Sequence, residues 1–274
     1  MWSDRLSSVE AERTERALTQ LEKVAWARPL LRRFQRGGGL CSENMPLLFE
    51  ARFAHELVRA GAEATYEYRS GVGNSTVDFP LPGSPEWFIE CVSVRTSTGA
   101  KRAIRRRGEI YEQSFTSVNE DPHQTPEGEM IRLGELIAEK VSVRGQPTKF
   151  PDTAPHRYHV IVVDTRGYLD GGGDAIDFRQ ITYGPRGVPE HLDWMVHWFG
   201  EQPIRGLFEK STPVRGAALM RSRIHFLHFV QEEKYTEGEI FKCGYMLANP
   251  WLFDDDASAR DVVRSYPLVR LDRS

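Results

Sequence analysis

The sequence predicts an α/β fold in which a mixed β-sheet is flanked by helices. A patterned helix over 44–60 precedes three short segments rich in β-branched and aromatic residues, at 63–69, 75–79 and 86–94. Turns of Gly, Pro, Asn or Ser separate these segments, as between strands. Later, the continuously apolar run 158–164 follows a long helical segment, which is typical of a buried strand reached by a crossover.

The composition narrows the class of protein. The chain has 274 residues, of which 40% are hydrophobic and 27% charged, which excludes disordered and collagen-like classes. The net charge of -3 means that any basic surface for nucleic acid is local. Three scattered cysteines without a CxxC pair argue against a disulfide framework or a zinc site. With no secretory signal and no membrane-length apolar run, the sequence predicts a cytoplasmic location and no membrane partner.

The N-terminal part is predicted to begin with one helix over 7–28. Ser7 and Glu10 have the spacing of a capping box, and apolar residues recur at helical spacing after them. Pro29 is expected to end or kink this helix before the short basic piece 30–36.

Gly37–Gly39 then marks a hinge. The expected organisation is an N-terminal helical appendage over 1–39 and an α/β domain over 40–274. The appendage would pack on the core or on a second subunit, which leaves a homodimer open.

Four further elements complete the prediction. The basic run at 101–107 and the segment of about 129–143 are expected to be helical, as is the Trp-rich segment 190–200. Two late strands at 224–230 and 240–247 are joined by a polar turn. A short helix closes the chain.

Three carboxylates occupy positions where apolar residues are expected. On the helix 44–60, Glu50 shares a stripe with Phe53 and Leu57. In the strand 86–94, Glu90 alternates onto the face of Phe88 and Val92, and Asp78 lies near the end of the strand before it.

A buried carboxylate needs a cation or hydrogen-bond partners. Three inward carboxylates on adjacent elements therefore suggest a cage for a hard divalent cation such as Mg²⁺. Each residue also has a purely structural interpretation: Glu50 reaches the surface or caps a neighbour, and Asp78 forms a turn.

The segments LLFEARFAHELVRAG, TVDFPL and EWFIECVSVRT together resemble the PD-(D/E)XK nuclease superfamily, which has the restriction-endonuclease-like fold. Its pattern is a Glu on the first core helix, an Asp on the second strand and Glu-x-Lys on the third. The resemblance covers about residues 44–164. Later motifs, ITYGPRGV, RGLFEK and MLANPWLF, look like the C-terminal half of uncharacterised bacterial members.

This resemblance assigns the acidic positions to Glu50, Asp78 and Glu90 and implies a site for one or two Mg²⁺ (or Mn²⁺) ions. Asp78 and Glu90 would be metal ligands, and Glu50 a third ligand or a water-orienting acid. The implied activity is metal-dependent hydrolysis of phosphodiester bonds in DNA or RNA, with DNA favoured as the partner.

The sequence departs from the family pattern at Val92, which stands where the motif lysine belongs. Either the site is inactive or the lysine comes from elsewhere. Lys140 is the main candidate because it continues the stripe of Leu133 and Ile137 on the helix 129–143. The structural alternative is that Lys140 only reaches solvent at a helix end. Weaker replacements are Ser93, Arg69 and Lys149.

The run KRAIRRR follows the strand that carries Glu90. On a helix, Arg102, Arg105 and Arg106 would share a face and contact phosphate oxygens. The alternative is a solvated helix face paired with nearby acidic residues.

Two functions from different classes therefore remain open. The intact acidic trio favours a metal-dependent nuclease. Val92 and the net charge of -3 favour a catalytically degenerate nuclease fold that acts as a nucleic-acid-binding or protein-interaction module.

Overall fold

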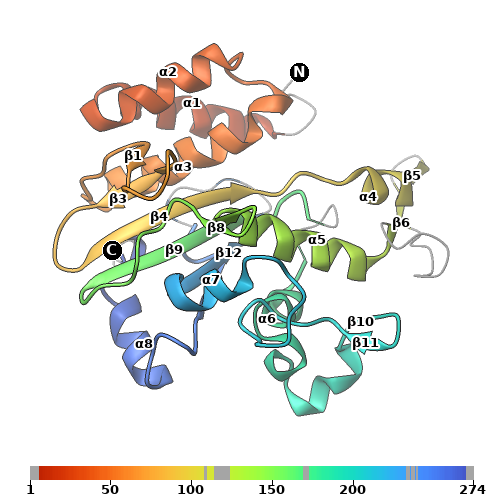
Figure 1. Ribbon diagram of the computed structural model, residues 1–274. Helices are drawn as coiled ribbons and strands as arrows, with labels where there is room; N and C mark the ends of the chain where they lie inside the picture. Colours follow the sequence, from red (N-terminus) through yellow and green to blue (C-terminus); the bar gives the residue numbers. More distant parts are fainter. Residues whose placement is uncertain are drawn as a thin grey trace.

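The computed structural model describes residues 6–107, 110–113, 124–168, 173–232, 235, 238 and 240–269. Its centre is a five-stranded mixed sheet with helices on both faces, as the sequence predicts (Figure 1). The strand order is β13-β12-β9-β4-β3. The strands are β3 (Phe79–Leu81), β4 (Glu86–Ser93), β9 (Arg157–Asp164), β12 (Phe226–Val230) and β13 (Gly244–Ala248).

The three central strands run parallel, and the two outer strands run antiparallel to their neighbours. Ile89 of β4 pairs with Val160 of β9, which in turn pairs with Phe226 of β12. The predicted crossover between β4 and β9 is therefore confirmed. The apolar run in β9 is explained by burial on both faces of the sheet.

One face of the sheet is covered by α1 (Ser8–Glu22), α2 (Arg28–Arg36) and α3 (Met45–Arg59) (Figure 1). Leu21, Leu30 and Phe53 from these three helices share a core with Ile89 of β4. The segment after α8 (Asp256–Val263) packs there too, since the ring of Tyr266 lies 5.0 Å from that of Trp87.

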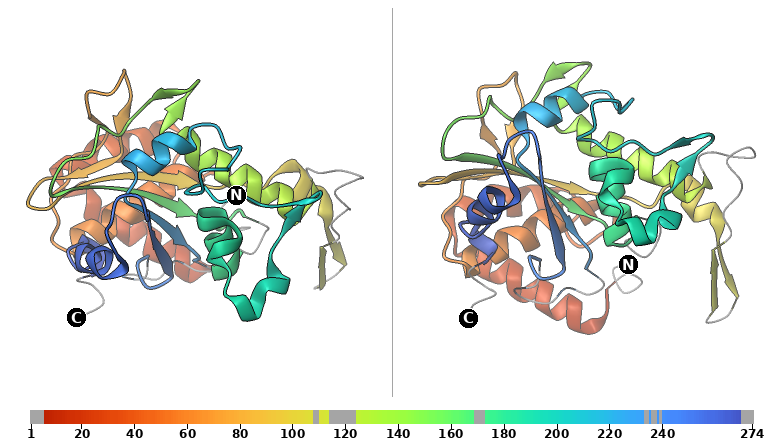
Figure 2. Two further views of the ribbon diagram at one scale, coloured as in Figure 1. Left: turned by 60° about the horizontal axis from the view of Figure 1, so that its bottom comes forward. Right: turned by 90° about the horizontal axis from the view of Figure 1, so that it is seen from below.

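The opposite face is covered by α5 (Pro126–Glu139), α6 (Ala175–Tyr183) and α7 (Ala217–Arg223) (Figure 2). Leu133 of α5, Phe178 of α6 and Met220 of α7 pack against sheet residues such as Ile161. Residues that alternate along β4 thus face two different helical layers.

Short two-stranded ribbons lie outside the central sheet, together with α4 (Thr98–Ala103). They are β1–β2 (Tyr68–Arg69, Thr76–Val77), β5–β6 (Ile104–Arg107, Ile110–Gln113), β7–β8 (Ser142–Val143, Gln146–Pro147) and β10–β11 (Trp198–Phe199, Gln202–Pro203). The β5–β6 ribbon extends away from the body of the molecule (Figure 2).

The prediction of one helix over 7–28 is wrong. The capping box of Ser7 and Glu10 begins α1, but α1 ends at Glu22, and a 3₁₀ turn follows at Ala25–Ala27. Pro29 lies in the first turn of α2 instead of ending a helix. A proline is tolerated there because N–H groups in the first turn of a helix have no intrahelical acceptor, so the missing N–H of proline costs no hydrogen bond.

The prediction of a helix over 101–107 is also wrong. The helix α4 ends at Ala103, and Ile104–Arg107 forms β5, which pairs antiparallel with β6. The run KRAIRRR has only two apolar residues and thus no stripe to hold it as a helix.

Other boundaries differ from the predicted ones. The segment 190–200 forms a 3₁₀ helix, Glu190–Met195, followed by β10, and its Trp194 and Trp198 are exposed. Most of 63–69 is not a strand, and the last strand begins only at Gly244. The helix expected over 129–143 begins earlier, at Pro126 after the N-cap Thr125.

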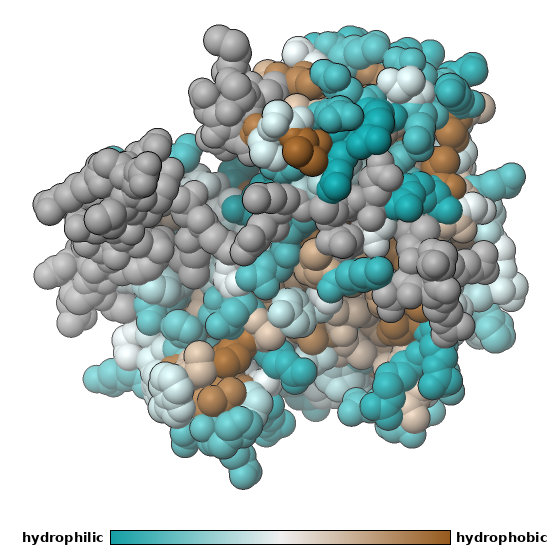
Figure 3. All heavy atoms as spheres, turned by 180° about the vertical axis from the view of Figure 1, so that it is seen from behind, coloured by the Kyte–Doolittle hydropathy of each residue, from teal (hydrophilic) through white to brown (hydrophobic). Residues whose placement is uncertain are grey.

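No helix among the described residues combines the length and the apolar character that a membrane span requires. On the face seen from behind, apolar side chains are scattered among hydrophilic ones (Figure 3).

Candidate functional site: a carboxylate–lysine cleft

The candidate site lies at the edge of β4 beyond its pairing with β3. β3 pairs with residues 87–89 only, so β4 continues past its neighbour from Glu90 to Ser93. A cleft of about 1030 Å³ runs along this stretch, and its lining residues include Glu50, Ser93 and Lys140. The cleft therefore receives side chains from both helical layers.

Asp78 joins the site through the backbone of β4. It stands between β2 and β3, and its Oδ2 accepts a hydrogen bond from the backbone N–H of Cys91 at 2.8 Å. This bond satisfies an N–H group at the sheet edge that β3 does not reach. Asp78 is buried, and its position next to Glu90 follows from the register of β3 on β4.

Glu90 is fully buried and lies on the sheet face that α5 covers. Its Oε1 is 2.9 Å from Nζ of Lys140 and 2.8 Å from Nζ of Lys149. Its Oε2 is buried and has no hydrogen-bond partner in the described part of the chain. A buried carboxylate oxygen without a partner is costly, so a cation beside it would lower that cost; Oε1 of Glu232 is in the same state.

Glu50 approaches from the opposite helical layer. It is buried on α3, where its Oε2 accepts a hydrogen bond from the hydroxyl of Tyr66 at 2.6 Å. The guanidinium of Arg33 donates to the same Tyr66 hydroxyl at 3.0 Å. Glu50 is thus positioned by a tyrosine, and its charge is close enough to Asp78 and Glu90 to influence them.

Burial and mutual repulsion raise the pKa of two of these carboxyl groups. Burial raises the pKa of Asp78 well above its ordinary value, and the charges of Glu90 and Glu50 add to the effect. Burial also raises the pKa of Glu50, although the Tyr66 hydrogen bond and the charge of Arg33 oppose the shift. A cation placed among these groups would relieve both effects.

Lys140 caps the C-terminus of α5. Burial alone would lower the pKa of its ammonium, but the carboxylates of Glu90 and Asp78 outweigh burial and raise it above the ordinary value. Lys140 is therefore protonated at neutral pH. A protonated lysine donates hydrogen bonds and positive charge, and it is not a general base.

Lys149 was the weaker expectation, yet it contacts the same oxygen of Glu90 as Lys140. It lies in a loop after β8 with a left-handed φ of 61°. Its backbone N–H donates to Ser75 Oγ at 2.8 Å, and its Nζ donates to the carbonyl of Thr76 at 3.0 Å. A lysine in a loop belongs to no helical or strand periodicity. The sequence pattern therefore could not show that Lys149 contacts Glu90 as Lys140 does.

Val92 occupies an apolar position. Its side chain is buried in the cluster between the sheet and α5 that includes Leu133 and Ile137. The two other weaker replacements do not take its place: Ser93 donates a hydrogen bond to Asp164, and Arg69 is exposed on β1.

The basic run does not form the expected surface. Arg102 is exposed on α4, whereas Arg105 and Arg106 are consecutive residues of β5, so the three do not share a helix face. The side chains of Arg105 and Arg106 lie outside the described part of the structure. A contact of these arginines with phosphate stays a prediction.

Among the described residues, no group of three or more His, Cys, Asp or Glu side chains is arranged to hold a metal ion. Asp78 and Glu90 nevertheless fit Mg²⁺, because this ion commonly takes one or two carboxylates and completes its shell with water and substrate phosphate. The unpartnered Oε2 of Glu90 is the atom that fits a cation best.

Comparison of the chain with protein-family models, with curated proteins and with solved structures found no match.

Proposed function

We propose that the cleft is the active site of a metal-dependent nuclease with a restriction-endonuclease-like fold. The observation that carries the proposal is the environment of Glu90: two lysines contact one of its oxygens, and the other oxygen is buried without a partner. A lysine beside an acidic pair is the arrangement that the PD-(D/E)XK resemblance implies, with Lys140 in place of the residue missing at Val92.

Asp78 and Glu90 would hold the metal ion. When bound, a divalent ion lowers the pKa of a coordinated water and neutralises charge on the scissile phosphate. The raised pKa of Asp78 agrees with a ligand role, because the group is poised to lose its proton when a cation arrives.

Lys140 would act on the substrate as a fixed positive charge. Since its ammonium is protonated, it can donate hydrogen bonds to an attacking water or to a phosphate oxygen. Its side chain is about one-third exposed to the cleft, so it can reach a substrate while it stays in contact with Glu90. Lys149 is tied to the carbonyl of Thr76 and would hold Glu90 in place.

The direct test is a cleavage assay of the full chain on single- and double-stranded DNA and RNA, with Mg²⁺ or Mn²⁺ and with a chelator. We expect metal-dependent cleavage that Asp78→Asn abolishes and that Lys140→Ala lowers by about 100-fold. Lys210→Ala, a lysine remote from Glu90, is the matched control and should cleave normally. Cleavage that persists in Asp78→Asn would overturn the site assignment.

The burial of Val92 in an apolar cluster favours the second candidate, a degenerate nuclease fold that binds without cleaving. The same assay separates the two functions when it is paired with a binding measurement. Nucleic-acid binding that is independent of metal and Lys140, with no cleavage of any substrate, would identify the second function.

A further inference from the structure

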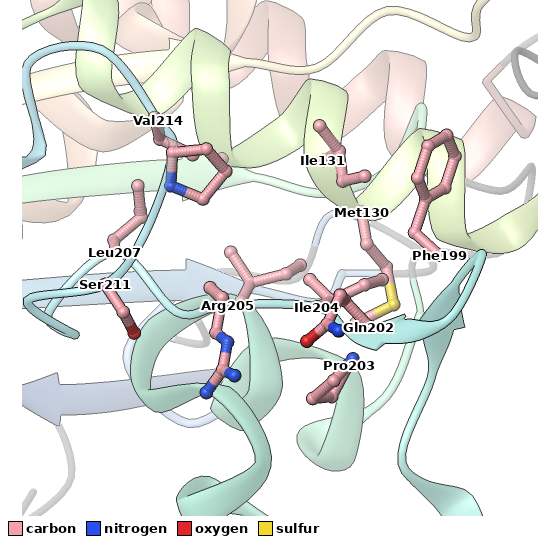
Figure 4. A pocket seen from close by; sticks show the side chains of 13 residues that line it. Met130, Ile131, Phe199, Gln202, Pro203, Ile204, Arg205, Leu207, Ser211 and Val214 are labelled. Atoms are coloured by element: carbon pink, nitrogen blue, oxygen red, sulfur yellow. The ribbon is translucent and has the colours of Figure 1, made fainter.

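A separate cavity lies on the side of α5 that faces the segment 199–214. Its volume is about 420 Å³, and its walls are mostly apolar (Figure 4). Met130 and Ile131 come from α5, and the other apolar lining residues include Ile181, Ile204, Leu207 and Val214. This size and lining are typical of a pocket for a small ligand.

Gly134 enlarges the cavity because it has no side chain at a position where alanine would fit. It lies in the interior of α5, and a Cβ atom added there would meet Leu207 Cδ2 at 3.8 Å and Val214 Cγ2 at 4.0 Å. These are ordinary contact distances, and the backbone of Gly134 is not left-handed. Alanine would therefore fit and would stabilise the helix, because glycine is a poor helix former. The packing of α5 therefore does not require glycine at position 134, and the missing side chain leaves additional volume in the cavity.

The mouth of the cavity carries hydrogen-bond donors. Gln202, Arg205 and Ser211 belong to its lining, and Figure 4 shows Arg205 on the side opposite α5. Among the described residues, the guanidinium of Arg205 lies 3.8 Å from Glu209 Oε1, a long ion pair that leaves its N–H groups able to donate hydrogen bonds to an anion as well. Donors at the mouth of an apolar pocket complement a ligand with an apolar body and an accepting head.

We propose that this cavity binds a small amphipathic molecule with an apolar body and a carboxylate head. The apolar body enters between α5 and the segment 199–214, above the open space at Gly134. The head stays at the mouth, where it accepts hydrogen bonds from Arg205. This site is independent of the proposed nuclease activity, since none of the three carboxylates of the cleft lines it.

The test uses the full chain and the fluorescent carboxylate 11-(dansylamino)undecanoate as the probe. Saturable fluorescence enhancement is expected for the unmodified protein, and decanoate should displace the probe. Gly134→Leu should weaken binding at least tenfold because the leucine fills the cavity. The matched control Gly134→Ala should bind within about twofold of the unmodified protein and melt at a higher temperature.

Two further variants test the apolar lining and the carboxylate-binding group separately. Ile131→Trp narrows the cavity from a partly exposed position and should also weaken binding, which covers the case in which Gly134→Leu fails to fold. Arg205→Gln should weaken displacement by decanoate and leave displacement by decanol unchanged. The absence of saturable binding, or equal binding by Gly134→Leu with an intact near-UV circular dichroism spectrum, would overturn the proposal.

Discussion

Two buried charge clusters in this protein differ in how their carboxylates are partnered. The first, here called the N-terminal cluster because it holds α1 and α3, consists of Glu10, Arg52, Arg166 and Glu232. In it, Glu232 contacts the guanidinium of Arg52, and the guanidinium of Arg166 lies 3.3 Å from Glu10 and 3.7 Å from Glu232. Both carboxylates of this cluster are therefore in direct contact with an arginine. Glu10 also accepts a hydrogen bond from the backbone N–H of Tyr235 at 2.8 Å.

At the candidate site, one of the three carboxylates is in direct contact with a cation, and Glu50 is the one of the three that lines the cleft. Glu90 contacts Lys140 and Lys149, but in the described part of the chain neither Glu50 nor Asp78 has a cation within ion-pair distance. The cations of the two clusters also differ, since Arg52 is almost fully buried and the lysines are 31% and 21% exposed. The N-terminal cluster thus ties α1 and α3 to the chain beyond β12, whereas at the candidate site Glu50 and Asp78 are buried without a cation in contact and the pKa of each is raised.

The largest expected effect is on the N-terminal cluster. Glu232→Gln should lower the free energy of unfolding by about 3–5 kcal/mol, because it leaves Arg52 charged, buried and without its carboxylate. Urea denaturation measures the change, with Asp261→Asn in an exposed pair as the control. A loss below about 1 kcal/mol would show that this cluster is not the structural tie described here.

A smaller effect is expected at the hydroxyl that positions Glu50. Tyr66→Phe removes the hydrogen bond that the tyrosine hydroxyl donates to the buried Oε2 of Glu50. This substitution should lower the free energy of unfolding by about 1–2 kcal/mol. The exposed Tyr68 offers the matched control, Tyr68→Phe, which should change stability by less than about 0.5 kcal/mol. Equal effects of the two substitutions would contradict the role given to Tyr66.

The stability of the metal-free protein should depend on pH through Asp78. Its folded-state pKa is raised, so the stability it contributes is present at low pH and lost as pH rises through that pKa. Asp78→Asn keeps the acceptor for the Cys91 N–H and removes the charge. In chelator at pH 8 the variant should therefore be more stable than the unmodified protein, and the difference should shrink as the pH is lowered and Asp78 takes up its proton. Parallel unfolding curves at these pH values provide the measurement.

The smallest expected change in stability is that of Glu90→Gln. Its two lysines can turn toward water, so the free energy of unfolding should fall by no more than about 1 kcal/mol, far less than for Glu232→Gln. Metal binding and cleavage should nevertheless be lost. A destabilisation equal to that of Glu232→Gln would show that the two clusters do not differ in kind.

Strong periodic patterns predicted the central part of the fold correctly. The apolar run of β9, the alternation in β4 and the stripe of α3 each arise from burial against a layer, and burial leaves a readable period in the sequence. The same patterns predicted that Glu90 shares a face with Phe88 and Val92 and that Lys140 continues the stripe of Leu133 and Ile137. In the structure these two faces pack against each other.

Features set by tertiary contacts could not be predicted in this way. The short strand β5 depends on its partner β6, and Pro29 begins a helix because the chain turns before it. Lys149 reaches Glu90 from a loop whose path is set by Ser75. The hydrogen bond from Tyr66 to Glu50 likewise joins residues from different elements, and no spacing within α3 reveals it.

The central claim is that Asp78 and Glu90 form a site for a divalent cation. Calorimetric titration with Mg²⁺ and Mn²⁺ tests it most directly, on the unmodified protein, Asp78→Asn and the Tyr68→Phe control. The account predicts binding to the unmodified protein and to Tyr68→Phe, weaker binding at low pH as Asp78 takes up a proton, and none to Asp78→Asn. No binding of either ion at millimolar concentration, or undiminished binding by Asp78→Asn, would contradict it.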